Sequence, residues 1–364
     1  MSDEQPTATA PPAPEAAAAP TPTPAATATA TTATDAATTT TATADTTATT
    51  AAAAPAPAPQ PEPEPEPKPE SDAAAAQATQ AQEKPKTPPQ DDPTTPIQDL
   101  WATAKAHEYP EIWGVTLADP SAHIPSQIVL QKYLNANDGD LVKAKDQLTK
   151  TLDWRKKTQP LELIKQTFSK EKFGGLGYVT TYSAEEKDGA REIFTWNVYG
   201  NVKSIDVTFG DPQEFINWRV ALMEQAVQEL SLATATVPIT ADPDADPYKM
   251  FQVHDYKGVS FLRQAPQVKA ASTETIRVFA TAYPELLKEK FFINVPAVMG
   301  FMYGFMKLFV AARTIKKFHP MSNGANLAKE DFGGSKVPLG QMLPPEYGGK
   351  GADLKTQGTE PLVE

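Results

Sequence analysis

The stretch Lys290-Phe-Phe-Ile-Asn-Val295 is followed directly by Pro296. Aromatic and β-branched residues dominate this stretch, as they do Glu192–Tyr199 and Met250–Tyr256, so each of the three predicts a strand. Proline has no backbone N–H to donate to a sheet, so we expect Pro296 to end the third strand. The fold class then depends on what lies between the strands.

Helical segments separate the predicted strands. Asp211 and Pro212 have the residue types of an N-cap and a first helical position, and residues 272–283 predict a second helix. Strands that alternate with helices predict an α/β domain with a largely parallel sheet. Upstream, apolar residues recur at helical spacing between residues 125 and 159, and they predict a small all-helical unit with Ser126 as a helix cap.

The N-terminal part of the chain has a different composition. The first 100 residues contain no aromatic residue, and 20 of the 36 prolines lie at or before Pro96. Such a segment cannot bury enough apolar surface to offset the entropy of ordering it, so we expect residues 1–96 to be a disordered tail.

Charge and cysteine content exclude several functions for the remainder. Residues 101–364 hold 31 acidic and 30 basic residues, so no strong basic field predicts nucleic-acid binding. The chain has no cysteine, which excludes disulfides and thiolate metal sites and permits an intracellular location. The sequence contains no phosphate-binding Gly-Lys-Ser/Thr loop and no Gly-x-Ser-x-Gly nucleophile elbow.

The segment Val295–Ala312 is apolar almost all the way round a helix. A transmembrane helix needs about 20 apolar residues, and Pro296 and Lys307 leave too few. Two interpretations remain, an ordinary core helix and the wall or lid of a pocket. Methionine-rich helices adapt to irregular partners, which suits a lipid pocket or a membrane contact. The large apolar residues of the segment include Met299, Phe301, Met302, Phe305 and Phe309.

Three polar residues fall in apolar surroundings. Arg219 lies within an apolar helical stripe, so its head group either meets a buried acceptor or extends along its stem to solvent. His254 and Tyr256 are two apart on a predicted strand, which places both on one face about 6–7 Å apart. They are either satisfied core residues or iron ligands, because tyrosine is a known haem ligand.

Four segments, in this order, resemble the CRAL-TRIO, or Sec-fourteen-like, lipid-transfer family. The resemblance spans residues 98–350 and implies a helical N-terminal domain over 97–165 and a CRAL-TRIO lipid-binding domain over 166–350. That domain would have a mostly parallel sheet, a ligand cavity and a gate helix after Pro296, and residues 351–364 would form a flexible tail. The four segments are Leu152-Asp-Trp-Arg155, His254-Asp-Tyr-Lys-Gly-Val259, Tyr283-Pro-Glu-Leu-Leu287 with Phe292-Ile-Asn-Val-Pro296, and Leu343-Pro-Pro-Glu-Tyr-Gly-Gly349.

Two further stretches, Thr195–Gly200 and Gln252–Ser260, are similar to the fungal Sec-fourteen homologue five branch. That branch is described as a non-classical phosphatidylinositol transfer protein that also binds haem b. The resemblance implies a lipid head-group site of Glu285, Thr314 and Lys317, although the family's arginines are absent from Leu130–Asn137. It also implies haem-site residues with Tyr256 as the iron ligand, namely Tyr199, Arg219, His254, Tyr256 and Lys290.

The resemblance therefore implies a protein that binds phosphatidylinositol and transfers it between membranes without catalysis, and that binds haem b with a role in oxidant stress. We expect it in the cytoplasm, with peripheral contact to endoplasmic reticulum or microsomal membranes. The alternative is a haem-dependent redox enzyme or a haem sensor without lipid transfer. An enzyme would need an acid–base residue on an open haem face, and the sequence offers only His254, which lies on the ligand's own strand.

Overall fold

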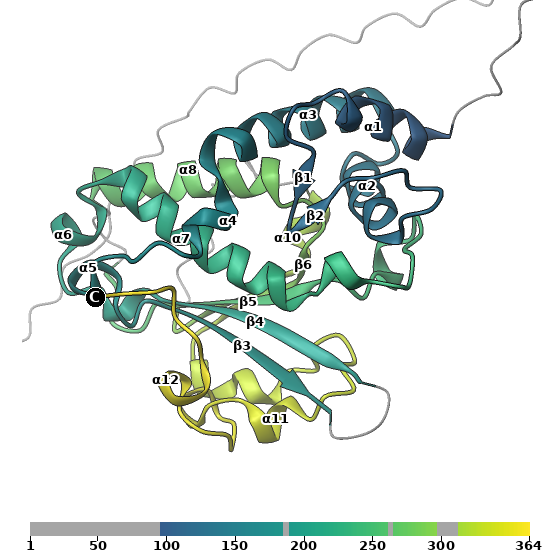
Figure 1. Cartoon of the computed structure of the whole chain (residues 1–364). Coiled ribbons are helices and arrows are strands. Elements are labelled where there is room, and N and C mark those ends of the chain that lie inside the picture. Colours follow the sequence, from purple (N-terminus) through teal and green to yellow (C-terminus); the bar gives the residue numbers. More distant parts are fainter. Residues whose placement is uncertain (1–94, 185–188, 261–264, 297–311) are drawn as a thin grey trace, which may run out of the picture. The chain divides into compact units, whose positions relative to one another are not determined.

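A computed structural model describes residues 95–184, 189–260, 265–296 and 312–364 (Figure 1). These residues belong to one compact unit that spans Lys84–Glu364. Nearly all of the tail expected over residues 1–96 lies outside the described residues, and the domain boundaries expected from the sequence stay predictions. The five residues expected on the gate helix also lie outside, namely Met299, Phe301, Met302, Phe305 and Phe309.

A five-stranded sheet forms the centre of the described fold, with the strand order β3-β4-β5-β6-β7. β3 pairs with β4 antiparallel, and every other neighbouring pair is parallel. This confirms the predicted α/β class with a mostly parallel sheet. The strands are β3 (Gly177–Ser183), β4 (Arg191–Val198), β5 (Met250–Asp255), β6 (Leu287–Ile293) and β7 (Phe318–Met321).

Two long helices, α7 (Pro212–Glu229) and α8 (Pro266–Ala282), lie on one side of this sheet, and the C-terminal elements lie on the other (Figure 1). The predicted cap of α7 is confirmed, since the Asp211 side chain accepts hydrogen bonds from the backbone N–H groups of Gln213 and Glu214. α8 begins before the predicted start at Ser272. The short helices are α4 (Pro160–Leu163), α5 (Lys170–Phe173), α6 (Ile205–Phe209), α10 (Ala312–Ile315), α11 (Leu339–Met342) and α12 (Leu354–Gln357).

The N-terminal elements pack beside α7 and α8. The predicted role of Ser126 is wrong, because this residue lies inside α2 and His123 occupies the N-cap position. The Ser126 hydroxyl instead accepts a hydrogen bond from the backbone N–H of Ala118 at 2.8 Å. The elements are α1 (Pro96–Lys105), a two-stranded pair of β1 (Glu111–Ile112) and β2 (Val115–Thr116), α2 (Ile124–Ala136) and α3 (Leu141–Thr158).

The C-terminal residues, expected to be flexible over 351–364, are held by backbone pairing instead. The Phe168 N–H donates to the Leu362 carbonyl at 2.8 Å, and the Glu364 N–H donates to the Phe168 carbonyl at 3.1 Å. Thr359 forms an antiparallel bridge with Val179 of β3. The segment also buries Leu354 in a core cluster that includes Tyr178 and Trp196.

A buried ion-pair network joins the N-terminal elements to α7 and to the end of α8. Arg155 of α3 donates to Glu224 at 2.6 Å and to Glu111 at 2.8 and 3.0 Å, and its side chain is fully buried. The Tyr283 hydroxyl donates to Glu224 at 2.8 Å. Burial opposes the charge of Arg155, but the two carboxylates beside it raise its pKa above the ordinary value.

We expect the substitution Arg155→Met to lower the free energy of unfolding by about 3–5 kcal/mol, because it leaves the fully buried Glu224 carboxylate without its cation. Denaturant titration of the purified chain measures this. Lys150→Met on the same helix is the matched control, since its ion pair with Asp146 is exposed and should contribute at most about 0.5 kcal/mol. Equal stabilities of the two variants would contradict a structural role for the network.

Candidate ligand-binding site

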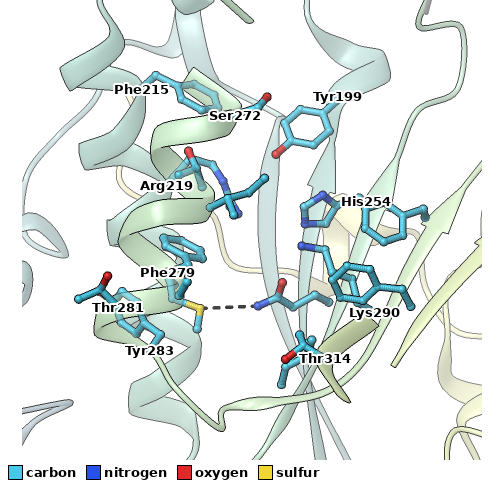
Figure 2. Close-up of a pocket in the computed structure, with 18 of the residues that line it drawn as sticks. Tyr199, Phe215, Arg219, His254, Ser272, Phe279, Thr281, Tyr283, Lys290 and Thr314 are labelled. Atoms are coloured by element: carbon cyan, nitrogen blue, oxygen red, sulfur yellow. Dashed lines mark hydrogen bonds between the residues drawn. The ribbon is translucent and has the colours of Figure 1, made fainter. Parts of the chain in front are cut away.

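A cavity of about 910 Å³ lies between the sheet and helices α7, α8 and α10. Cavities of roughly 300–1,000 Å³ are typical of small-molecule sites. Side chains reach it from several separate segments, so the cavity exists only once the sheet and both long helices have packed (Figure 2). All eight residues predicted for the haem and head-group sites line it: Tyr199, Arg219, His254, Tyr256, Glu285, Lys290, Thr314 and Lys317.

One wall of the cavity is a cluster of aromatic rings at the carboxyl ends of β4 and β5. The ring centroids of His254 and Tyr256 are 6.4 Å apart, in agreement with the shared face predicted from their spacing. The Tyr199 ring lies 5.5 Å from His254 and 5.4 Å from Tyr256. Phe292 of the neighbouring strand β6 lies 5.6 Å from His254. Parallel strand pairing therefore gathers these rings from three places in the sequence.

Arg219 reaches the cavity from α7. Its side chain is 3% exposed, and its guanidinium carbon lies 5.3 Å from the centroid of Phe279 and 5.9 Å from that of Trp218. The head group therefore does not extend to solvent; it points toward His254 and Lys290 (Figure 2). Nε of Arg219 is buried and has no hydrogen-bond partner among the described residues. No described carboxylate forms an ion pair with it.

Lys290 of β6 is the second cation of this wall. Its Nζ lies over the rings of Phe292 and Phe318, at 5.3 and 5.7 Å from their centroids. Burial and the nearby charge of Arg219 lower its pKa to about 7. In the described part of the chain, no carboxylate pairs with Lys290 either. The wall therefore concentrates positive charge that the described side chains do not neutralise.

Two further polar side chains of this wall, His254 and Tyr256, are neutral in the protein without a ligand. Burial, together with the positive charges of Lys290 and Arg219, lowers the pKa of His254 well below its ordinary value. Burial and the neighbouring Tyr199 raise the pKa of Tyr256, although Arg219 opposes this change. Nε2 of His254 is buried without a hydrogen-bond partner among the described residues. A ligand that enters here meets unsatisfied nitrogen atoms.

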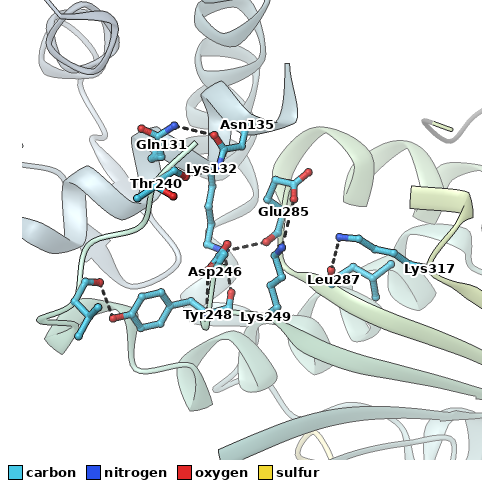
Figure 3. A network of polar contacts seen from close by, with 11 residues as sticks. Gln131, Lys132, Asn135, Thr240, Asp246, Tyr248, Lys249, Glu285, Leu287 and Lys317 are labelled. Carbon is cyan, nitrogen blue, oxygen red and sulfur yellow. Dashed lines mark hydrogen bonds and ion pairs between the residues drawn. The ribbon is translucent and has the colours of Figure 1, made fainter. Parts of the chain in front are cut away.

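The second polar region of the cavity contains the predicted head-group residues (Figure 3). Lys317 follows α10 and donates to the Leu287 carbonyl at 2.9 Å. The Glu285 carboxylate lies 3.9 Å from Nζ of Lys249. Thr314 of α10 lines the same part of the cavity. Cationic and hydroxyl groups of this kind suit a phosphate-bearing head group.

Lys132 is a functional candidate that the sequence did not reveal. It lies on α2 with its side chain fully buried, and its Nζ is 2.5 Å from the Asp246 carboxylate. The same Nζ donates to the Glu285 carbonyl at 2.9 Å, where the backbone has a φ of 55° (Figure 3). Lys132 thus holds the strained turn that carries Glu285. Its sequence neighbours give no signal, because its partners lie more than 100 residues away.

Gln252 was also missed, although its position carries a signal. It lies two residues before His254 on β5, so it shares the face that lines the cavity. Its Nε2 lies 3.9 Å from the sulfur of Met223 on α7. Gln252 pairs in register with Lys290 of β6, and the pattern that selected His254 and Tyr256 extends to it.

The described residues contain neither a membrane-spanning helix nor a carboxylate, histidine and cysteine cluster for a metal ion. In that part of the chain, no helix is long and apolar enough to cross a membrane. The same residues contain no cluster of three or more histidine, cysteine, aspartate or glutamate side chains able to hold a metal ion. Asp246, the last of three alternating aspartates in the sequence, pairs with Lys132.

Comparisons with known proteins agree with this fold. The CRAL/TRIO domain family matches residues 188–349. Phosphatidylinositol transfer protein SFH5 of Chaetomium globosum is 69% identical over 273 residues, which are 74% of this chain and 62% of that protein. Phosphatidylinositol transfer protein sfh-5 of Neurospora crassa is 61% identical over 275 residues, which are 74% of this chain and 75% of that protein.

A solved structure, described as the crystal structure of Sfh5, has the same fold. It is 25% identical, the TM-score is 0.60, and the match covers 75% of this chain and 95% of that one. The alignment with the Chaetomium protein spans less than two thirds of that protein's length. The high identities and the matched domain show that the chain belongs to the CRAL/TRIO family and, within it, to the fungal Sec-fourteen homologue five branch.

Proposed function

We propose that this chain binds phosphatidylinositol in the cavity and transfers it between membranes without catalysing a reaction. The observation that carries the proposal is one cavity of about 910 Å³ with aromatic walls and a polar region of Glu285, Thr314 and Lys317. A lysine at the polar region suits the phosphate, and the apolar walls suit acyl chains. The printed names of the relatives from Chaetomium and Neurospora describe the same activity for those proteins.

A protein that exchanges lipid must meet membranes and leave them again. We therefore propose a cytoplasmic location with peripheral contact to endoplasmic reticulum or microsomal membranes. The family resemblance supports this location. The finding that no described helix could span a membrane is compatible with it.

We also propose that the cavity holds haem b, with Tyr256 as the iron ligand and a role in oxidant stress. The donor set fits the group: a partly buried tyrosine, two cations without described carboxylate partners, and a buried His254 Nε2 without a hydrogen-bond partner among the described residues. Burial disfavours a tyrosinate at Tyr256, so a bound metal cation and Arg219 would have to stabilise it. When bound, the haem would supply a redox-active iron.

The site favours binding over catalysis. Haem-dependent catalysis needs a side chain that accepts and donates protons near the operating pH. The pKa of His254 is far below that range because of burial and the neighbouring cations. His254 also lies two residues from Tyr256 on one face of the sheet, beside the proposed iron ligand rather than across the cavity from it.

We expect Lys317→Ala to slow the transfer of phosphatidylinositol between vesicles by about tenfold or more, because a charge-assisted contact to phosphate contributes about 1.5–3 kcal/mol. Transfer of labelled lipid from donor to acceptor vesicles measures the rate. Lys316→Ala is the matched control, since this neighbouring lysine is exposed and does not line the cavity. Equal rates for the two variants and the wild type would refute the head-group assignment.

We expect the purified wild-type chain to be coloured, and Tyr256→Phe to weaken its Soret absorption by removing the iron ligand. Absorption spectroscopy of protein produced with ample haem measures both effects. Tyr182→Phe is the control, since Tyr182 packs with Phe194 among apolar residues away from the cavity and its buried hydroxyl has no described hydrogen-bond partner. A colourless wild type, or an unchanged spectrum in Tyr256→Phe, would exclude the haem proposal as stated.

A further inference from the structure

The cavity contains two cations that no described carboxylate neutralises. A guanidinium stays protonated in proteins, so Arg219 cannot lose its charge to escape burial. An isolated buried charge costs far more than a paired one, which makes an anionic group of a ligand the natural partner. By contrast, Lys132 pairs with Asp246, and Lys249 pairs with Glu285. The missing partner therefore belongs to one place, beside Arg219 and Lys290.

The surroundings of the two cations select the shape of the anion. The guanidinium carbon of Arg219 lies 5.3 Å from the ring centroid of Phe279, and Nζ of Lys290 lies 5.3 Å from that of Phe292. A strongly hydrated ion would have to shed its water to bind beside these aromatic rings. The His254 ring, whose buried Nε2 lacks a partner among the described residues, can donate one hydrogen bond at the same point. A planar group with two acceptor atoms on an apolar body fits a guanidinium, an ammonium and an imidazole together.

The remainder of the cavity indicates where the apolar body would lie. At one end the wall is lined by Glu285, Thr314 and Lys317, the residues proposed for the phosphatidylinositol head group. At the other end the cavity is lined by apolar side chains, among them Val202, Ile205 and Phe209 of the α6 region and Val268 of α8. Ile205 is 43% exposed, so this end reaches the protein surface. An extended chain would run from the cations toward α6.

We propose that the cavity binds a long-chain carboxylate, a fatty acid, with its carboxylate between Arg219 and Lys290 and its chain directed toward α6. This binding activity is separate from phosphatidylinositol transfer, whose proposed head-group residues lie at the other end of the cavity. Haem b also carries carboxylates on an apolar body, and it would compete for the same two cations. The shared chemistry is the carboxylate, and separate measurements distinguish the two sources.

The test uses the full chain produced under haem depletion, titrated with oleate and with oleyl alcohol, which has the same chain but no charge. We expect one oleate per chain in native mass spectrometry, and calorimetric binding at least about tenfold tighter than for oleyl alcohol. Lys290→Met should remove most of this difference in affinity, because it should weaken the binding of oleate but not that of oleyl alcohol. Lys290→Arg should restore the preference for oleate. Haem added to the wild type should displace the oleate.

Equal affinities for oleate and oleyl alcohol in the wild type would overturn the proposal, and so would a Lys290→Met variant that still prefers oleate to the wild-type extent. The wild-type comparison and the Lys290 variants decide the question without a substitution at the buried Arg219. Vesicle transfer of phosphatidylinositol is measured on the same preparations. Loss of oleate discrimination with intact transfer rejects this inference alone, whereas absent transfer with intact discrimination rejects the proposed transfer function alone.

Discussion

The buried contact between Arg155 and Glu224 supports the arrangement on which the site depends. Glu224 lies on α7, and the hydroxyl of Tyr283, just after α8, donates to the same carboxylate. One carboxylate therefore fixes α3, α7 and the end of α8 with respect to one another. α7 carries Arg219 into the cavity, and the chain after Tyr283 carries Glu285. Both regions of the cavity are therefore positioned by this network, and Tyr283 is the member of it that also lines the cavity.

The cavity differs from this network in how its charges are neutralised. Arg155, Lys132 and Lys249 each have a carboxylate partner within 4 Å. Arg219 and Lys290 have none among the described residues, and His254 beside them is held neutral by burial and by their charges. The protein thus pairs the buried charges that maintain its structure and leaves positive charge where a ligand would enter. An apolar ligand with an anionic group beside Arg219 and Lys290 explains this contrast, and the proposed haem b and fatty acid are both of that kind.

The elements that could be predicted from the sequence are those determined by the residue types within the element itself. Strands β4, β5 and β6 and the Asp211 cap of α7 follow from propensity and spacing, and the shared face of His254 and Tyr256 follows from strand geometry. β3 was missed because it starts at Gly177 directly after a glycine cluster, and β7 because four residues that include Pro320 carry little strand signal. Pro320 is tolerated because β7 lies at the edge of the sheet.

Features that depend on residues far away in the chain could not be predicted from the sequence. The C-terminal residues pair through their backbone, and the apolar side chains that they bury, Leu354 and Val363, have no regular spacing in the sequence. Lys132 looks like an ordinary helix lysine until Asp246 and the Glu285 carbonyl surround it. The sequence could not decide whether the Arg219 head group is buried or extends to solvent, for the same reason. Only the packed cavity shows that the head group faces inward.

The central claim is that the cavity holds an apolar molecule bearing an anionic group. Mass spectrometry of an organic extract of the purified wild-type chain, with an absorption spectrum of the intact protein, tests it most directly. The account predicts about one molecule per chain of a phosphate- or carboxylate-bearing ligand, either phosphatidylinositol, haem b or a fatty acid. Recovery of neutral lipids alone, or of no ligand from a folded protein, would contradict it.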